Sequence, residues 1–178
     1  MKKIYFVRHG QTFWNAENKI CGATDIALTE LGHEQAKKTG RAILDAGIKA
    51  DEILYSPLIR AKDTALHISD MTGIPAREEV RLKEQNFGKY ESTPRDGQEF
   101  AMAKRQFANR YEGGESMLKL AQRIYNLLDE LKEDDKTYIL VAHNGIARVV
   151  QSYFYEMTND EYGAFGINNC EVREYIYE

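Results

Sequence analysis

The chain has 178 residues, enough for one domain with a substantial core, since globular domains usually contain roughly 100–200 residues. Its apolar fraction of 43% and charged fraction of 29% are ordinary for a globular protein, and no stretch reaches membrane-spanning length. The net charge of −4 argues against broad binding to nucleic acid or to an anionic membrane surface, because both need a basic patch.

The cysteines and the N-terminal segment bear on the compartment. Cys21 and Cys170 are the only cysteines, and their spacing is typical of neither a disulfide scaffold nor a metal site. This usage suits a reducing compartment. The apolar run from Ile4 to Val7 is too short for a signal peptide and ends at Arg8. We therefore expect a cytoplasmic protein. Its oligomeric state is left open, a homo-oligomer included.

The predicted elements alternate between buried strands and amphipathic helices. In chain order, the pattern predicts a strand at Lys3–Val7, a helix after Thr29 that stops near Gly47, a strand at Glu52–Tyr55, a helix capped by Ser56 with Pro57 at its first position, a helix from Ser116 to about Leu131, a strand at Thr137–Ala142, a helix from near Gly145, and an edge strand at Glu171–Tyr177. This alternation indicates one domain, residues 1–178, folded as a three-layer α/β/α sandwich with a largely parallel central sheet.

Polar residues with affinity for phosphate stand at the ends of these elements. Arg8 and His9 follow the first strand, and His143 follows the strand that ends at Ala142. Parallel strands would bring these residues to one sheet edge, where open α/β sheets bind their ligands. Arg60 falls in the first turn of a helix, where free N–H groups already favour an anion. The sequence therefore predicts a phosphate pocket.

Each of these residues also has a plain structural explanation. His9 alone could be a hydrogen-bonded structural histidine, Arg60 a solvated helix residue, and His143 a helix cap. Three separate structural roles, each at the end of a strand or helix, explain the pattern less well than one shared site.

Five segments along the chain also match a known pattern in order. They are Val7–Thr12 with Asn15, Cys21-Gly22 before Asp25 and Leu28–Gly32, Ser56–Ala61, Leu82–Glu84 with Gly88, and Gly114–Ser116 with Arg123. Together they resemble the histidine phosphatase superfamily in its phosphoglycerate mutase-like branch, over nearly the whole chain. The resemblance implies a small phosphorylated metabolite as substrate and no cofactor.

The resemblance also assigns roles at the site. His9 would attack phosphorus and form a phosphohistidine, while Arg8, Arg60 and His143 hold the transferring oxygens. Glu84 would protonate the leaving group and then activate water. Further phosphate donors would come from Asn15, Cys21, Gly22 and Asn144.

Two positions depart from the family pattern. Asn144 stands where glycine is common, so its amide could itself face the phosphate. Tyr90-Glu91-Ser92 replaces the usual tryptophan-glutamate-glycine and makes Glu91 a second candidate for the acid. Glu84 has a structural alternative of its own, a plain ion pair with an arginine.

The choice of activity rests on the segment that covers the site. Only about thirty residues separate Glu84 from Glu115 in the sequence, whereas mutases of this type carry longer covering segments. A short cover admits water, so we expect a phosphatase, with phosphoglycerate mutase as the alternative. A non-catalytic phospho-ligand-binding module is disfavoured because no required group is missing. A metal-dependent hydrolase is disfavoured because arginines beside His9 and His143 would repel a cation.

Specificity should lie between Asn86 and Gly114, which would arch over the pocket. This segment interleaves aromatic residues with cations, namely Tyr90, Phe100, Phe107, Tyr111, Arg95, Lys104, Arg105 and Arg110. These side chains could hold a sugar, a nucleoside-like group or a second anion. The preferred interpretation is that the aromatic residues pack against the core and that most of the cations are solvated. Sugar phosphates, phosphoglycerates and α-ribazole phosphate all remain candidate substrates.

Overall fold

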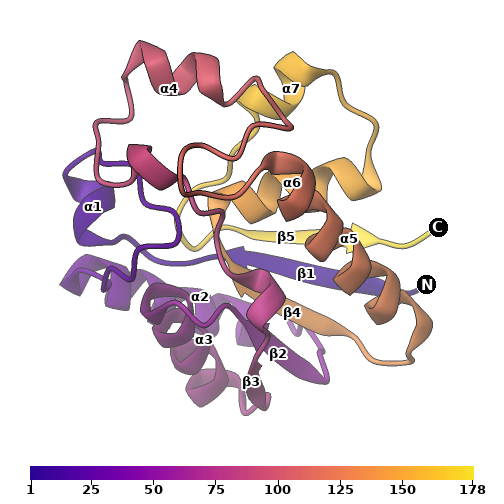
Figure 1. Cartoon of the computed structure of the whole chain (residues 1–178). Helices are drawn as coiled ribbons and strands as arrows, with labels where there is room; N and C mark the ends of the chain where they lie inside the picture. The colour runs from indigo at the N-terminus through magenta and orange to yellow at the C-terminus, as the bar shows by residue number, and fades with distance from the viewer.

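A computed structural model describes all 178 residues and places a five-stranded sheet at the centre (Figure 1). The strands are β1 (Lys3–Arg8), β2 (Glu52–Tyr55), β3 (Ala76–Glu78), β4 (Tyr138–Ala142) and β5 (Val172–Ile176), in the order β3-β2-β4-β1-β5. The first four are parallel, and β5 runs antiparallel to β1 at one edge. The four predicted strands are confirmed, and β3 is an addition.

Helices cover both faces of this sheet (Figure 1). The long ones are α2 (Glu30–Asp45) and α3 (Ile59–Thr72) on one face, and α5 (Met117–Glu133) and α6 (Asn144–Phe154) on the other. The predicted α/β/α sandwich is therefore confirmed. The short elements, none of which was predicted, are α1 (Phe13–Ala16), η1 (Val80–Leu82), η2 (Gly88–Tyr90), α4 (Gln98–Ala103) and α7 (Asn159–Ala164). No helix has both the length and the apolar character needed to cross a membrane.

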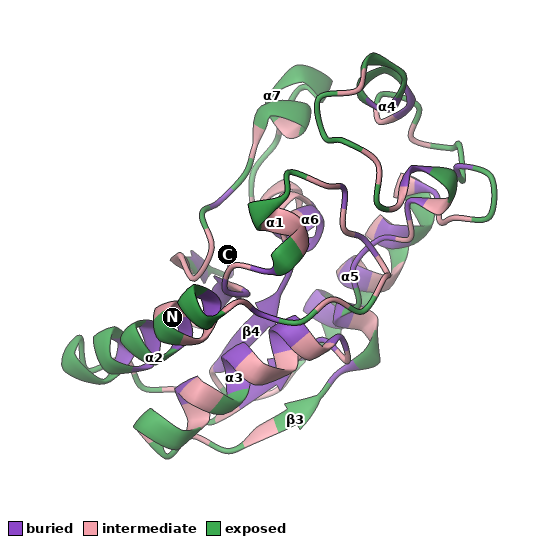
Figure 2. Cartoon of the chain, turned by 90° about the vertical axis from the view of Figure 1, so that its left-hand side faces the viewer, coloured by how far each residue is buried: buried purple, intermediate pink, exposed green.

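The core forms because strand residues alternate between the two faces. Ile4 and Phe6 pack toward α5 and α6, whereas Tyr5 and Val7 pack toward α2 and α3. Every residue of β4 is buried, as Figure 2 shows for the centre of the molecule. Each fully buried apolar side chain of this kind stabilises the fold by about 1.5–3 kcal/mol.

The start of α3 differs from the prediction. The helix begins at Ile59 rather than Pro57, and Leu58 at the N-cap position supplies no side-chain cap. Asp25, from a distant loop, accepts a hydrogen bond from the Ile59 amide at 2.8 Å and caps the helix instead. The Ser56 hydroxyl is therefore not a helix cap, and it lies against His143.

The connections make a topological switch point between β1 and β4. These strands are parallel neighbours, but the chain leaves β1 toward α2 on one face and leaves β4 toward α6 on the other. Such a switch point opens a ligand crevice at the carboxyl ends of the two strands. His9 and His143 directly follow those ends.

Candidate active site

His9 lies almost completely buried at the end of β1, with 5% of its surface exposed. Its Nδ1 lies 2.7 Å from the Gly10 carbonyl, so Nδ1 must donate and Nε2 carries the free electron pair. Burial, with the nearby charges of Arg60 and Arg8, holds the pKa of His9 well below its usual value. The ring is therefore neutral at pH 7 and has one nitrogen available as a nucleophile.

His143 lies beside His9, and their ring centroids are 5.2 Å apart. Its Nε2 lies 2.7 Å from the Ser56 hydroxyl oxygen. Its Nδ1 is buried and has no hydrogen-bond partner. Burial and the charge of Arg60 hold the pKa of His143 well below its usual value, so this ring is also neutral.

The two predicted arginines reach the same site. Arg60 is completely buried, and its two Nη atoms donate to the carbonyls of Thr24 and Gly22 at 2.7 and 2.5 Å. Arg8 donates through Nη1 to the Ile167 carbonyl at 2.5 Å. Burial and neighbouring cations lower the pKa of Arg8 to about 10, which leaves it charged at neutral pH.

Arg8, Arg60 and His143 each have a buried polar atom without a hydrogen-bond partner. In the whole chain, the buried side-chain nitrogens and oxygens that lack a hydrogen-bond partner are Arg8 Nε, Arg60 Nε and His143 Nδ1. A buried polar atom without a partner costs roughly 1–3 kcal/mol. All three atoms belong to residues of the candidate site, and their lack of partners favours a bound anion as their acceptor.

Glu84 is also buried, within electrostatic range of Arg8 and Arg60. Its carboxyl oxygens accept hydrogen bonds from the amides of Gln85 and Gly145, both at 2.9 Å. It forms no ion pair, so the alternative that it neutralises an arginine is wrong. Burial raises the pKa of Glu84 despite the two amide donors, which favours a carboxyl group that can carry a proton.

Glu91 has a different place in the structure. Its carboxylate accepts hydrogen bonds from the amides of Gly22 and Ala23 at 2.8 and 2.7 Å. Glu91 thus anchors the loop whose carbonyls hold Arg60, and it does not fit the role of second acid.

The backbone amides of Cys21 and Gly22 differ in whether they are free to bind phosphate. The Gly22 amide donates to Glu91 and is not free, contrary to the prediction, whereas the Cys21 amide makes no hydrogen bond within the chain. Burial raises the pKa of the Cys21 thiol to about 11, so it is not a reactive thiolate.

The two asparagines are used mainly in local structure. Asn15 accepts a hydrogen bond from the Thr12 amide at 3.1 Å and closes the capping box of α1. Asn144 accepts one from the Ile167 amide at 3.0 Å and so holds the loop that receives Arg8. The Asn144 oxygen therefore binds the chain itself, while its NH2 group makes no hydrogen bond and the residue lines a cavity with Glu84, so the prediction that this amide faces the phosphate stays a prediction.

Comparison with known proteins decides the family. The model of the histidine phosphatase superfamily (branch 1) matches residues 4–178. The chain belongs to this superfamily. The expected family is thus confirmed. Among curated relatives, a probable phosphoglycerate mutase, GpmB, of Yersinia pestis is 32% identical and is matched over 100% of this chain and 86% of its own length.

Solved structures of histidine phosphatase relatives have the same fold. A mycobacterial glucosyl-3-phosphoglycerate phosphatase has a TM-score of 0.81 and 27% identity, over 97% of this chain and 89% of that one. A phosphoserine phosphatase from Entamoeba histolytica, in complex with 3-phosphoglyceric acid, has a TM-score of 0.83 and 28% identity, over 99% and 91%. Both are named as phosphatases.

Several residues near the site were not predicted as part of it. Arg95, Lys104 and Arg148 line a cavity together with Glu84. Lys104 was expected to be solvated but is partly buried there, so that interpretation is wrong for Lys104, whereas Arg95 is exposed, as expected. Arg148 lies one helical turn after Asn144, and this spacing was the available signal. No group of three or more His, Cys, Asp or Glu side chains is placed to share a metal ion.

Proposed function

We propose that this histidine phosphatase hydrolyses small-molecule phosphomonoesters through a phosphohistidine on His9. The observation that carries the proposal is the set of three unpartnered donors, from Arg8, Arg60 and His143, gathered beside a neutral His9 with one free nitrogen. Phosphoryl transfer depends mainly on positioning and on neutralising oxygen charge, and these groups supply both. No metal is needed for this role.

In the first step, the Nε2 electron pair of His9 attacks phosphorus, and the bond from phosphorus to the leaving oxygen breaks. The proton on Glu84 passes to that oxygen, which leaves as an alcohol. The Gly10 carbonyl keeps Nδ1 protonated, so the ring bears a positive charge while it carries the phosphoryl group. Arg8, Arg60 and His143 bind the three remaining oxygens.

In the second step, water attacks the phosphorus and the N–P bond breaks. The ionised Glu84 takes the proton of the water, and the electron pair returns to His9 Nε2. Phosphate leaves, and both groups regain their starting states. Glu84 alternates between acid and base because burial keeps its pKa raised.

The proposal is tested by trapping the intermediate. Brief incubation with a labelled phosphomonoester, followed by quenching in alkali, should leave label on the protein that is lost in acid, as expected of phosphohistidine. His9→Ala should carry no label and should lose at least about 10⁴-fold in kcat, because no other residue can act as nucleophile. His33→Ala, a histidine on α2 that the mechanism does not use, is the control. Substantial turnover by His9→Ala contradicts the proposal.

The alternative is a phosphoglycerate mutase, which the similarity to the probable GpmB mutase supports. Incubation with 3-phosphoglycerate and a little 2,3-bisphosphoglycerate separates the two activities. A phosphatase releases inorganic phosphate, whereas a mutase forms 2-phosphoglycerate.

A further inference from the structure

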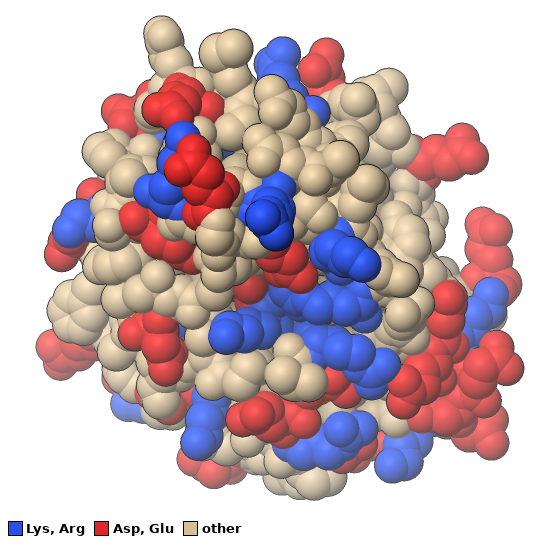
Figure 3. Space-filling view, viewed as in Figure 1, with Lys and Arg blue, Asp and Glu red and all other residues tan.

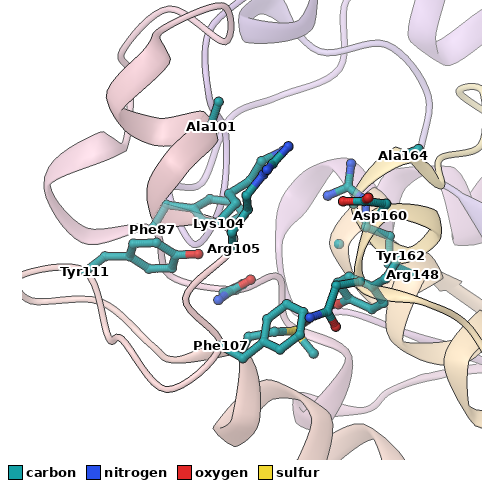
Figure 4. Close-up of a pocket in the computed structure, with 15 residues that line it drawn as sticks. Phe87, Ala101, Lys104, Arg105, Phe107, Tyr111, Arg148, Asp160, Tyr162 and Ala164 are labelled. Atoms are coloured by element: carbon teal, nitrogen blue, oxygen red, sulfur yellow. Dashed lines mark hydrogen bonds between the residues drawn. The ribbon is translucent and has the colours of Figure 1, made fainter.

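Two adjoining cavities extend from Glu84 toward the surface. The smaller, about 110 Å³, is lined by Glu84, Arg95, Lys104 and Arg148, among others. The larger, about 640 Å³, lies between the α4 segment and α7. In Figure 4, Lys104 and Tyr111 approach this space from one side, and Arg148 and Tyr162 from the other. The two cavities share four lining residues, Phe87, Lys104, Gly145 and Arg148, so they form one path out of the site.

The cations on this path have no acidic partner. Arg95 donates through Nε to the Lys19 carbonyl, and Arg148 donates through Nε to the Phe165 carbonyl. The Lys104 ammonium makes no hydrogen bond and lies 5.1 Å from the centroid of the Phe100 ring. None of the three has a carboxylate within ion-pair distance, although the chain contains 28 acidic residues.

What distinguishes these three cations is that they line a cavity beside Glu84 and yet have no ion pair. Figure 3 shows basic side chains gathered in the middle of one face, over the region of η1 and α5, with acidic side chains beside them. In that region, Arg81 pairs with Glu79 and Glu130, and Arg123 pairs with Glu115. Ion pairing thus accounts for those arginines but not for Arg95, Lys104 and Arg148 along the cavities.

The unpaired charges also repel one another. Burial and the charges of Arg148 and Arg95 lower the pKa of Lys104 to about 8. Arg8 and Arg60 add two more positive charges deeper in the site, whereas a bound phosphomonoester brings at most two negative ones. The phosphate alone therefore does not neutralise the outer cations, and neither of the acidic side chains that line the cavities, Glu84 and Asp160, lies within ion-pair distance of them.

We infer that the substrate carries a second anionic group on its leaving alcohol, held by Arg95, Lys104 and Arg148, and an organic body that occupies the larger cavity. The inference rests on the proposed phosphatase activity, because Glu84 marks the leaving-group side. A volume of about 640 Å³ falls within the range of sites that bind drug-sized molecules. The lining residues Phe107, Met117 and Tyr162 suit an aromatic or apolar body. A three-carbon phospho-acid would leave most of this space empty.

The test compares two probes that differ only in charge. These are 4-carboxybenzyl phosphate and its uncharged amide, 4-carbamoylbenzyl phosphate. Because hydrogen bonds to charged groups are worth roughly 10- to 100-fold, kcat/KM should favour the carboxylate by about tenfold or more. The preference should shrink as salt is added, since salt screens charge.

Substitutions test whether Arg95, Lys104 and Arg148 cause the preference for the carboxylate probe. In Arg148→Met and Lys104→Met, the ratio of kcat/KM for the two probes should fall toward one. Arg110→Met removes an exposed arginine from the same covering segment but outside both cavities, and it should keep the wild-type ratio. Ala101→Trp, which fills the larger cavity, should lower the ratio of kcat/KM between 4-carboxybenzyl phosphate and the small phosphoglycolate.

The outcomes separate the two proposals. If wild-type protein hydrolyses both benzyl phosphates equally, or if the preference survives in Arg148→Met and Lys104→Met, the second-anion subsite is refuted while the phosphatase activity stands. If no probe is hydrolysed, calorimetric binding of the two probes to His9→Ala still tests the subsite. A carboxylate preference of tenfold in that binding supports the subsite, and equal binding refutes it.

Discussion

At the scale of single residues, Glu84 is the group whose role is tested most sharply by leaving-group chemistry. Glu84→Gln keeps the shape of the side chain, although its single oxygen can accept from only one of the Gln85 and Gly145 amides, which donate to different oxygens of Glu84. We expect kcat to fall about 10²- to 10⁴-fold for an alkyl phosphate but far less for p-nitrophenyl phosphate, whose leaving group needs little protonation. Glu91→Gln, which alters the loop anchor, should show no such dependence on the leaving group. Equal losses on both substrates in Glu84→Gln would argue against the acid role.

Ser56 is a second residue whose effect is local. Its hydroxyl oxygen already accepts a weak hydrogen bond from the Leu58 amide at 3.4 Å, so its proton is free to be donated to His143 Nε2. That donation leaves the ring proton on Nδ1, the atom without a partner. We infer that the hydrogen bond runs in this direction, so that Ser56 favours the His143 tautomer that can donate to phosphate.

Removal of this hydroxyl should weaken phosphate binding. We expect Ser56→Ala to lose roughly 10- to 100-fold in kcat/KM, because one hydrogen bond to a charged group is misdirected. Ser56→Thr should recover much of the loss, and Ser69→Ala, at the far end of α3, should behave as wild type. Nitrogen-15 spectra of His143 should show the tautomer change in Ser56→Ala. An unchanged tautomer together with unchanged kinetics would contradict this role.

At the scale of elements, α6 positions the acid through its first turn. Gly145 donates its amide to Glu84 at 2.9 Å, and a Cβ at Gly145 would lie 2.4 Å from Glu84 Oε1. A side chain at this position therefore pushes the carboxyl group away. Because a carboxyl group can rotate, Gly145→Ala should move Glu84 rather than unfold the helix.

We therefore expect Gly145→Ala to reproduce the leaving-group dependence of Glu84→Gln, with a melting temperature within a few degrees of wild type. Gly97→Ala is the matched control, since its added Cβ makes only an ordinary 3.5 Å contact with the Pro94 carbonyl. A large loss of melting temperature, or equal losses on alkyl and aryl phosphates, would contradict this account.

Element length decided how much of the fold could be predicted. The buried strands β1 and β4 were found within one residue at each end, because unbroken apolar runs mark strands that are buried on both faces. The helices α1, α4 and α7 have only four to six residues, too few to show a helical period. The exposed, three-residue β3 carries no apolar pattern at all.

The candidate site could be predicted where its residues follow long elements. His9, His143 and Arg60 were found from their positions at the ends of β1 and β4 and the start of α3, and Glu84 was found only through the family resemblance. Ser56 was mistaken for a helix cap because the true cap, Asp25, comes from a distant part of the chain. Such tertiary partners leave no local signal.

At the scale of the whole molecule, charge is distributed unevenly. The chain has a net charge of −4, yet Arg8, Arg60, Arg95, Lys104 and Arg148 gather around one edge of the sheet. The buried histidines between them stay neutral because a further positive charge there would be costly. The buried histidines therefore make the folding stability of the protein depend on pH.

The sign of this dependence follows from the pKa of each state. In the unfolded chain, His9 and His143 take up protons below about pH 6.5, whereas in the folded chain their pKa values lie well below this. The unfolded state therefore binds more protons as the pH falls below about 6.5, and the free energy of unfolding decreases. Each histidine contributes up to about 1.4 kcal/mol per pH unit, while Glu84, whose pKa is raised by burial, acts in the opposite direction.

We expect the free energy of unfolding in urea to fall by roughly 2–3 kcal/mol between pH 7.5 and pH 5.5. Phosphate must be absent from the buffer, because an anion that binds only the folded state would mask the loss. His143→Asn removes one of the two titrating groups, so its decrease over the same range should be about half as large. A free energy that is flat or rises toward pH 5.5 would mean that the buried histidines accept protons in the folded protein. That result would contradict the lowered pKa values of His9 and His143 and remove burial as the reason why His9 is neutral.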